Sequence, residues 1–178
     1  MEIQIRQAKL VLRVGDITKQ EVDVIVNAAN NNLMHGGGVA AAIASAAGPK
    51  LIEASKRAGY VKTGSYAKTN AGNLQAKYVF HAVGPVWNGG IREENKYLAS
   101  AVRSCLEGME KERLQTIAFP AISTGIYGYP IDKAAQIILK TIVQFLKNQA
   151  SSIKVVKVIL FTDKDLLIFR KALNQMEI

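Results

Sequence analysis

The sequence predicts an α/β domain in which helices cover both sides of a largely parallel sheet. Short apolar runs rich in Val and Ile alternate along the chain with segments in which apolar residues recur at helical spacing. The chain has 178 residues, a length that suits one domain with a sizeable core, and we expect residues 1–178 to form it. Hydrophobic residues make up 49% of the sequence and charged residues 21%, which is an ordinary globular composition.

The first half of the sequence predicts five strands of the sheet and two helices. The run EVDVIVNAA is apolar enough for a strand that is buried on both faces. The run VAAAIASAA is typical of a tightly packed helix, which Gly48 and Pro49 end. The elements expected here are strands at 2–6, 9–14 and 21–29, helices at 39–47 and 49–58, and strands at 65–70 and 77–83.

The second half predicts three helices and two further strands. Apolar residues recur on one helical face between Arg92 and Lys111, and again between Asp132 and Leu146. The runs TIAFPAI and VVKVILF are short buried strands, and a closing helix is expected from Asp163 to Met176. The apolar faces consist of Leu98, Ala101, Val102, Cys105, Leu106 and Met109 in the first helix and Ala135, Ile138, Leu139, Ile142 and Phe145 in the second.

The net charge and the cysteine content indicate which partners and which cellular compartment to expect. The net charge of +9 comes from 23 basic and 14 acidic residues and is spread over both halves of the chain. A positive field favours polyanionic partners such as nucleotides or nucleic acid, and a basic surface that only serves solubility is the alternative. No apolar run approaches the roughly 20 residues of a membrane span, so no membrane partner is expected. The one cysteine, Cys105, indicates a reducing, cytoplasmic setting and predicts packing rather than chemistry.

Four polar segments follow predicted strands, where ligands bind in sheets of this class. NAANNNLMHGGGV follows the strand at 22–26, and the segment Ser123 to Gly128 follows the strand at 116–119. Phe161 begins a third segment after the last strand, and a fourth runs from Gly15 to Thr18. The sequence therefore predicts a ligand site that these segments share.

Glycines in two of the segments predict an anion site. Gly36, Gly37 and Gly38 precede a helix, so bare backbone and unpaired helix N–H groups can approach a ligand together. The segment with Gly125 and Gly128 has the same character, and a diphosphate held between the two is the functional interpretation. Tight turns without a ligand are the alternative for either segment alone. Neither segment matches a Walker A loop or the GxGxxG pattern.

Amide, carboxylate and imidazole side chains stand beside these glycines. The amides of Asn27 and Asn30 can donate to and accept from ribose hydroxyls, or they can satisfy the loop backbone, and we expect one of the two to be partly structural. Asp16 can accept from an exocyclic amine such as adenine N6, with a capping role at a short helix, where Thr18 can also cap, as the alternative.

The two histidines are expected to differ. His81 lies among apolar residues of a strand and predicts a buried, hydrogen-bonded core residue. His35 precedes the glycines, where a solvent-facing side chain is expected and a proton carrier near the distal ribose is the alternative. The histidines and the cysteine lie far apart without ligand spacing, so the sequence predicts no metal and no cofactor.

The motifs GDIT, VDVIVNAANNNLMHGGGVAAAIASAAGP, KYVFHAVGP and IAFPAISTGIYGYP together resemble the macro domain family in order and spacing. The resemblance covers roughly residues 10 to 170 and is greatest to archaeal-type macro domains. It implies a three-layer α/β/α sandwich around a mixed, largely parallel sheet that binds ADP-ribose across the strand ends. It further implies a stand-alone domain, expected to be monomeric, with ADP-ribose and ADP-ribosylated proteins as partners and nucleic acid only as a secondary one.

The resemblance also implies a role for each matching residue. Asp16 would bind the adenine amino group beside the backbone of Ile17, and Phe161 would stack on the base. Asn30 would face the distal ribose, and Asn27 would support its loop. The other ligand-binding residues would be Gly36, Gly37, Gly38 and Val39 at the distal ribose and diphosphate and Ser123, Thr124, Gly125, Ile126 and Tyr127 around the diphosphate, with Asn30, Tyr127 and Gly37 as the catalytic group.

Position 40 departs from the pattern of many hydrolases in the family. Those enzymes carry Asp directly after GGGV, where it positions or activates water, and this chain has Ala40. General-base catalysis contributes about 10²–10⁴-fold, so turnover is expected to be weaker. The expected functions are therefore hydrolysis of mono-ADP-ribose from protein carboxylates or of O-acetyl-ADP-ribose, with ADP-ribose 1″-phosphate as a variant substrate, and a non-catalytic reader of ADP-ribose as the alternative.

Overall fold

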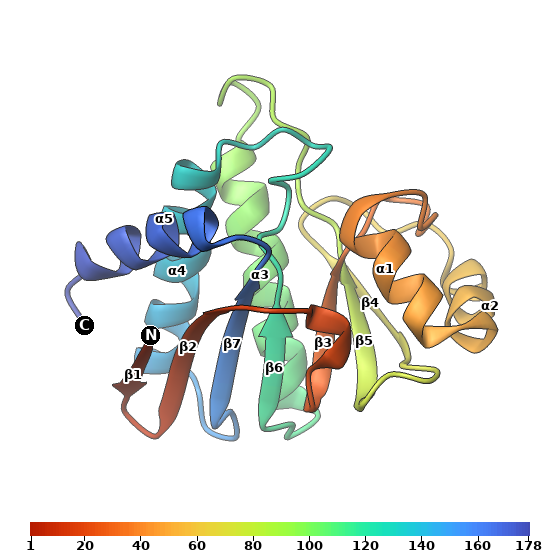
Figure 1. Ribbon diagram of the computed structural model, residues 1–178, viewed down its shortest axis with the longest axis horizontal. Coiled ribbons are helices and arrows are strands. Elements are labelled where there is room, and N and C mark those ends of the chain that lie inside the picture. Colours follow the sequence, from red (N-terminus) through yellow and green to blue (C-terminus); the bar gives the residue numbers. More distant parts are fainter.

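The computed structural model describes residues 1–178 and contains a seven-stranded sheet with helices on both sides (Figure 1). The strands are β1 (Glu2–Ile5), β2 (Ala8–Val14), β3 (Val22–Ala28), β4 (Tyr66–Asn70), β5 (Ala76–Ala82), β6 (Thr116–Phe119) and β7 (Val155–Leu160). The helices are η1 (Ile17–Lys19), α1 (Gly38–Ala47), α2 (Pro49–Ala58), α3 (Glu94–Lys111), α4 (Ile131–Asn148) and α5 (Asp163–Asn174).

The sheet is mixed but largely parallel, as the sequence predicts. Its strand order is β1-β2-β7-β6-β3-β5-β4. The inner pairs β2–β7, β7–β6, β6–β3 and β3–β5 are parallel, and antiparallel pairs occur only at the two edges, β1–β2 and β4–β5. Parallel neighbours send their carboxyl ends to one edge of the sheet, and this edge is uppermost in Figure 1. The three-layer α/β/α prediction is confirmed.

Alternate residues of the inner strands enter two different cores. In β3, Val24 and Val26 belong to the core cluster that also contains side chains of α3, α4 and α5, whereas Ile25 belongs to the cluster that contains side chains of α1 and α2. Successive side chains of a strand point to opposite faces, so a run that is apolar at every position requires cover on both sides. Figure 1 shows α3 and α4 behind the sheet and α1 and α2 beside β5 and β4.

The helical faces predicted from periodicity are buried. Every predicted apolar position of α3 and α4 lies in the core, including Cys105, and burial raises the pKa of the Cys105 thiol far above its usual range. The helix α3 starts at Glu94 instead of Arg92, because the Glu94 carboxylate accepts hydrogen bonds from the loop before it. None of the helices combines the length and the apolar character that crossing a membrane would need.

Candidate functional site

Four polar segments line the edge formed by the carboxyl ends of the inner strands. Helix η1 follows β2, Phe161 and Thr162 follow β7, residues 120–130 follow β6, and residues 29–37 follow β3. We call residues 29–37 the glycine loop and residues 120–130 the serine loop. Because β2, β7, β6 and β3 are consecutive neighbours in the sheet, the four segments lie in a row along one edge.

The glycine loop and the serine loop contact each other. A Cβ atom built on Gly37 would lie 3.2 Å from Cδ1 of Ile126, closer than most side-chain contacts. The side chain of Ile126 is otherwise 85% exposed. Two segments almost ninety residues apart in the sequence therefore meet at this edge, as the glycine pattern predicts.

The glycine loop presents backbone N–H groups without acceptors in the protein. The N–H groups of Gly36, Gly37, Gly38 and Val39 donate to no protein atom, and the first hydrogen bond of α1 is from the Ala41 N–H to the Gly37 carbonyl at 3.2 Å. No side chain caps this helix. The start of α1 therefore has the free backbone donors and the positive end of a helix dipole that can bind an anion.

The serine loop presents a second set of free donors. The N–H groups of Gly125, Ile126 and Tyr127 have no protein acceptor, while the loop closes on itself through Gly128 N to Gly125 O at 3.0 Å. The Thr124 hydroxyl donates to the Ala121 carbonyl at 2.7 Å, so it holds the turn instead of facing a ligand. Between two such loops, a diphosphate would find donors on both sides.

Ser123 stands out within the serine loop. Its backbone has φ +67°, a left-handed conformation that is uncommon for residues other than glycine, and its side chain is buried. Its Oγ has no hydrogen-bond partner. A Cβ atom on Gly84 would lie 2.2 Å from this Oγ, so the chain after β5 must pass Ser123 as bare backbone. Strain and unsatisfied polar atoms of this kind concentrate at functional sites.

The two predicted asparagines have different positions. The Asn30 amide donates to the Met34 carbonyl at 2.8 Å and accepts from the Met34 N–H at 2.9 Å, which fixes its orientation and leaves one hydrogen and one lone pair free. Asn27 is fully buried, with its amide nitrogen toward His35 and His81. This position behind the loop fits the supporting role expected of Asn27, and it leaves no exposed surface of Asn27 for a ligand.

The histidines differ from one another as expected. His81 is a fully buried core residue, and burial lowers its pKa to about 3. His35 is half-buried instead of lying free in solvent: its Nε2 lies 2.9 Å from Ser55 Oγ, its Nδ1 lies 3.4 Å from Asn27 Nδ2, and burial lowers its pKa. With both ring nitrogens engaged by protein groups, His35 is not placed to carry a proton to a ribose.

Asp16 has the capping role that the sequence left open. Its Oδ1 accepts from the N–H of Thr18 at 2.9 Å and from the Thr18 hydroxyl at 2.6 Å, so Asp16 rather than Thr18 caps η1. The Thr18 hydroxyl holds the pKa of the Asp16 carboxyl below its usual value. Oδ2 remains free apart from Lys19 at 4.0 Å. The side chain of Ile17 is buried in the core, which leaves only its backbone for a ligand.

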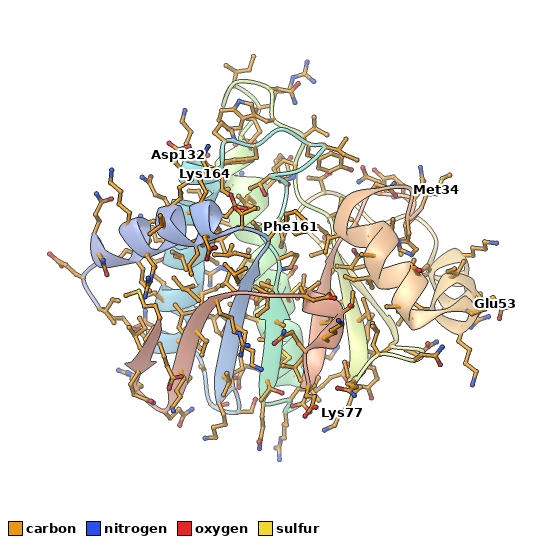
Figure 2. All side chains as sticks on the ribbon, in the orientation of Figure 1. Met34, Glu53, Lys77, Asp132, Phe161 and Lys164 are labelled. Atoms are coloured by element: carbon orange, nitrogen blue, oxygen red, sulfur yellow. The ribbon has the colours of Figure 1, made fainter.

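Two aromatic side chains border the loops. Phe161 is 88% exposed at the end of β7, and Figure 2 shows it at the upper edge of the sheet, between α5 and α1. An apolar ring with so little contact is available for stacking. Tyr127 is half-buried, and burial raises the pKa of its phenol, so its hydroxyl remains protonated at neutral pH. The Tyr127 carbonyl accepts from the Trp87 N–H at 2.8 Å.

Sequence reasoning missed the segment between β5 and α3, residues 83–93. Trp87 joins this segment to the serine loop through its backbone, and its ring packs on Tyr129 with a centroid distance of 4.6 Å. The Glu94 carboxylate shapes the segment by accepting from three backbone N–H groups, those of Asn88, Gly90 and Arg92. The turn signals Gly-Pro and Asn-Gly-Gly mark this segment, but they do not reveal which loop it will contact.

Two surface hollows lie away from this edge. They have volumes of about 400 and 610 Å³ and are lined mainly by β1 with the end of α4 and by α5. Neither contains a buried polar atom that lacks a partner. The two such side-chain atoms in the protein are Asn27 Oδ1, near the end of β3, and Ser123 Oγ, in the serine loop after β6. We therefore place the functional site at the strand ends.

Comparison with known proteins shows the family to which the fold and these motifs correspond. The family model for the Macro domain matches residues 26–138. An O-acetyl-ADP-ribose deacetylase of Salmonella gallinarum is 51% identical over 140 residues, which are 76% of this chain and 78% of the relative. The Oceanobacillus iheyensis macrodomain with ADP has a TM-score of 0.94 at 41% identity, covering 98% of this chain and 94% of that chain. The Trypanosoma brucei macrodomain in complex with ADP-ribose has a TM-score of 0.85 at 33% identity, covering 91% and 68%.

Proposed function

The chain belongs to the macro domain family, and from that membership we propose that its strand-end edge binds ADP-ribose. The observation that supports this most is the contact of the glycine loop with the serine loop, because each loop offers unpaired N–H groups there. A diphosphate needs many donors at close range, and two loops of bare backbone provide them without steric hindrance.

The remaining parts of the ligand are assigned by chemistry. The exposed ring of Phe161 stacks on the adenine, and the free Oδ2 of Asp16 accepts from the adenine amino group. The distal ribose lies over Gly37, Gly38 and Val39, with the remaining amide hydrogen and lone pair of Asn30 directed to its hydroxyls. Tyr127 covers the same ribose from the serine loop.

We propose that the protein hydrolyses esters carried by this distal ribose. Water adds to the ester carbonyl, the bond from the carbonyl carbon to the ribose oxygen breaks, and that oxygen takes a proton to become the ribose hydroxyl. The products from O-acetyl-ADP-ribose are ADP-ribose and acetate, and mono-ADP-ribose on a protein carboxylate is the related protein substrate. Asn30, held at both ends by Met34, orients the water, while the Gly37 N–H and Tyr127 place the ribose.

The absence of an acidic group in the two loops favours a second candidate. Residues 27–40 and 120–130 contain no Asp and no Glu, and Ala40 is buried in the first turn of α1. Without a carboxylate, the substrate itself has to take the proton of the attacking water, through a phosphate oxygen that passes it to the leaving ribose oxygen. A non-catalytic reader that binds ADP-ribose, free or at a polymer end, is therefore the alternative function.

Titration and turnover together distinguish these candidates. Calorimetric titration with ADP-ribose, with AMP and ATP as controls, tests binding, and release of acetate or of protein-linked ADP-ribose tests hydrolysis. Hydrolysis is excluded if release stays at the spontaneous rate and Asn30→Ala behaves as the parent. Tight binding without turnover selects the reader. In that case Ala40→Asp is expected to raise turnover by up to about 10²-fold without changing affinity.

We further infer that residues 1–178 act as one monomeric domain and that nucleic acid is at most a secondary partner. The net charge of +9 supports weak polyanion binding, but the exposed aromatic at the site is the single ring of Phe161. Binding of single-stranded nucleic acid depends strongly on salt. An affinity for oligonucleotides that exceeds the affinity for ADP-ribose at physiological salt would reverse this ranking.

A further inference from the structure

A buried polar chain lies behind the glycine loop and is not used in the proposed reaction. It joins α2, the loop, β3, β5 and β4 through the side chains of Ser55, His35, Asn27, His81 and Thr69. Asn27 Nδ2 lies 3.4 Å from His35 Nδ1 and 3.1 Å from His81 Nδ1. The far nitrogens of the two rings reach hydroxyls, His35 Nε2 to Ser55 Oγ at 2.9 Å and His81 Nε2 to Thr69 Oγ1 at 2.8 Å.

The partners of the two hydroxyls fix the direction of every hydrogen bond in this chain. The Ser55 hydroxyl donates to the Leu51 carbonyl at 2.9 Å, and the Thr69 hydroxyl donates to the Asn70 carbonyl at 2.9 Å. Each hydroxyl oxygen therefore accepts from an imidazole Nε2–H. Both Nδ1 atoms are then acceptors, and the two hydrogens of the Asn27 amide go one to each ring.

This arrangement is compatible only with two neutral imidazoles. A protonated ring carries a hydrogen on Nδ1, which would point at an amide hydrogen of Asn27. The rings also stack, with centroids 5.3 Å apart, so two positive charges would repel at short range. In the register of the sheet Asn27 is the direct neighbour of His81. The pairing of β3 with β5 therefore fixes these two residues side by side, independently of the glycine loop.

His35 connects this fixed pair to the glycine loop. It directly precedes Gly36, Gly37 and Gly38, which have no side chains with which to hold their own position. We propose that His35, supported by Asn27 and His81, is a positioning residue that holds these glycines in the conformation that binds the diphosphate, and that it does so only as a neutral imidazole. This inference rests on the proposed function of the glycine loop.

The surroundings of His35 contain no charged group that would keep its ring protonated. On the neighbouring elements, β3 contributes Asn27, β5 contributes His81 and α2 contributes Ser55, and α1 has no ionisable side chain. The charged residues of α2 and of the segment between α2 and β4 are exposed, and Figure 2 shows Glu53 on the outer side of α2. They are Lys50, Glu53, Lys56 and Arg57 on α2 and Lys62 before β4. Burial is accordingly the sole cause that lowers the pKa of His35.

The test compares His35→Ala with His35→Gln in the full chain. Glutamine keeps a donor that can reach Ser55 and an acceptor for Asn27, but it does not titrate. At pH 7.5 His35→Ala is expected to bind ADP-ribose about tenfold more weakly than the parent, since two hydrogen bonds are lost, and His35→Gln to bind within about threefold of it. In the parent, the dissociation constant is expected to rise below the pH at which the His35 ring takes up its proton in ¹⁵N NMR spectra. His35→Gln should show no such rise.

Two results would overturn the inference: His35→Ala binding as tightly as the parent, or His35→Gln binding as weakly as His35→Ala. If the parent does not bind ADP-ribose at pH 7.5, the proposed function fails. The positioning of the glycine loop can still be tested by NMR on the protein without ligand. The amide signals of Gly36, Gly37 and Gly38 should then shift or broaden in His35→Ala and stay in place in His35→Gln. The amide signal of Gly125 in the serine loop is the internal control, and unchanged glycine signals in both variants would refute the positioning role.

Discussion

The glycine loop and the serine loop offer the same donors but are held in place by different means. Side chains hold the glycine loop: Asn31 donates to the Val61 carbonyl at 2.8 Å, and His35 is bound to Ser55. Backbone hydrogen bonds hold the serine loop. The Tyr129 N–H donates to the Ser123 carbonyl at 3.0 Å within the loop, and the Trp87 N–H donates to the Tyr127 carbonyl from the neighbouring segment. One loop therefore depends on a titratable group, and the other depends on close backbone packing.

The difference follows from what precedes each loop. The strand β3 lies between β6 and β5 and ends in Asn27, so polar atoms are buried beneath the glycine loop and need partners. The strand β6 ends in Phe119, and the serine loop rises from an apolar floor that offers no polar partner. Two loops that bind one diphosphate should therefore respond differently to acid and to steric change.

The largest effect is expected from steric change beneath the serine loop. In Gly84→Ala the new Cβ would lie 2.2 Å from Ser123 Oγ and 2.6 Å from Ile122 Cγ2, so the loop must move. We expect a loss near the upper end of about 1–3 kcal/mol in the free energy of unfolding, measured by urea denaturation. Gly36→Ala, which meets nothing within 4 Å, is the matched control in the glycine loop and should be neutral. Equal losses in both variants would remove the distinction between the loops.

Acid is expected to act through the histidines behind the glycine loop. Unfolded, His81 takes up a proton near its ordinary pKa of 6.5, whereas burial lowers the folded value to about 3. The unfolded state thus binds more protons below pH 6.5, and stability falls as the pH falls. The loss should reach about 2 kcal/mol at pH 5. Urea denaturation between pH 7.5 and pH 5 measures this loss, in a range where most carboxylates remain ionised.

Direct observation of the ring provides the control for the acid experiment. The His81 ring should show no titration above pH 5 in NMR spectra of the folded protein. A ring that titrates near pH 6.5 would show that the buried chain does not require neutral histidines. The Gly84→Ala variant should keep the same pH slope as the parent, because its defect lies beneath the other loop.

The sequence was sufficient for the architecture and for the row of polar segments. Burial on both faces of β3, the helical faces of α3 and α4 and the position of His81 all follow from residue patterns, because periodicity reports burial directly. The meeting of the loops followed from a general rule on parallel strand ends and did not require coordinates.

Side-chain partners could not be predicted in the same way. His35 was expected to face solvent because its hydroxyl partner, Ser55, lies 20 residues away on a different element. The hydrogen bonds between Asn30 and Met34 and between Trp87 and Tyr127 depend on loop conformations. The periodic spacing of apolar residues does not predict such conformations. The sequence could not decide whether Asp16 caps η1 or binds the base. In the structure only Oδ1 is used by the cap, so the two roles are compatible, and a residue pattern cannot show this.

Neither loop contacts the base in the proposed arrangement, so the adenine depends on the third segment, which Phe161 begins. Phe161→Ala should weaken ADP-ribose binding about tenfold, since stacking on an aromatic ring contributes about 1–3 kcal/mol per base. Stability should not change, because the ring is 88% exposed. Calorimetric titration measures the effect, and Leu167→Ala, which removes another exposed apolar side chain, is the control. An unchanged dissociation constant would place the adenine elsewhere.

The smallest effect separates the two roles of Asp16. Asp16→Ala removes the cap of η1 and should lower the free energy of unfolding by about 1 kcal/mol, whereas Asp16→Asn keeps the cap through its amide oxygen. In Asp16→Asn the free Oδ2 is replaced by an amide N–H group, a donor that would face the adenine amino group, also a donor. Preference for adenine over hypoxanthine should therefore fall by about 1 kcal/mol in this variant without loss of stability. Titration with ADP-ribose and its hypoxanthine analogue measures the preference. If the parent binds both equally, Asp16 is a cap alone, and base recognition belongs to Phe161 without an acidic partner.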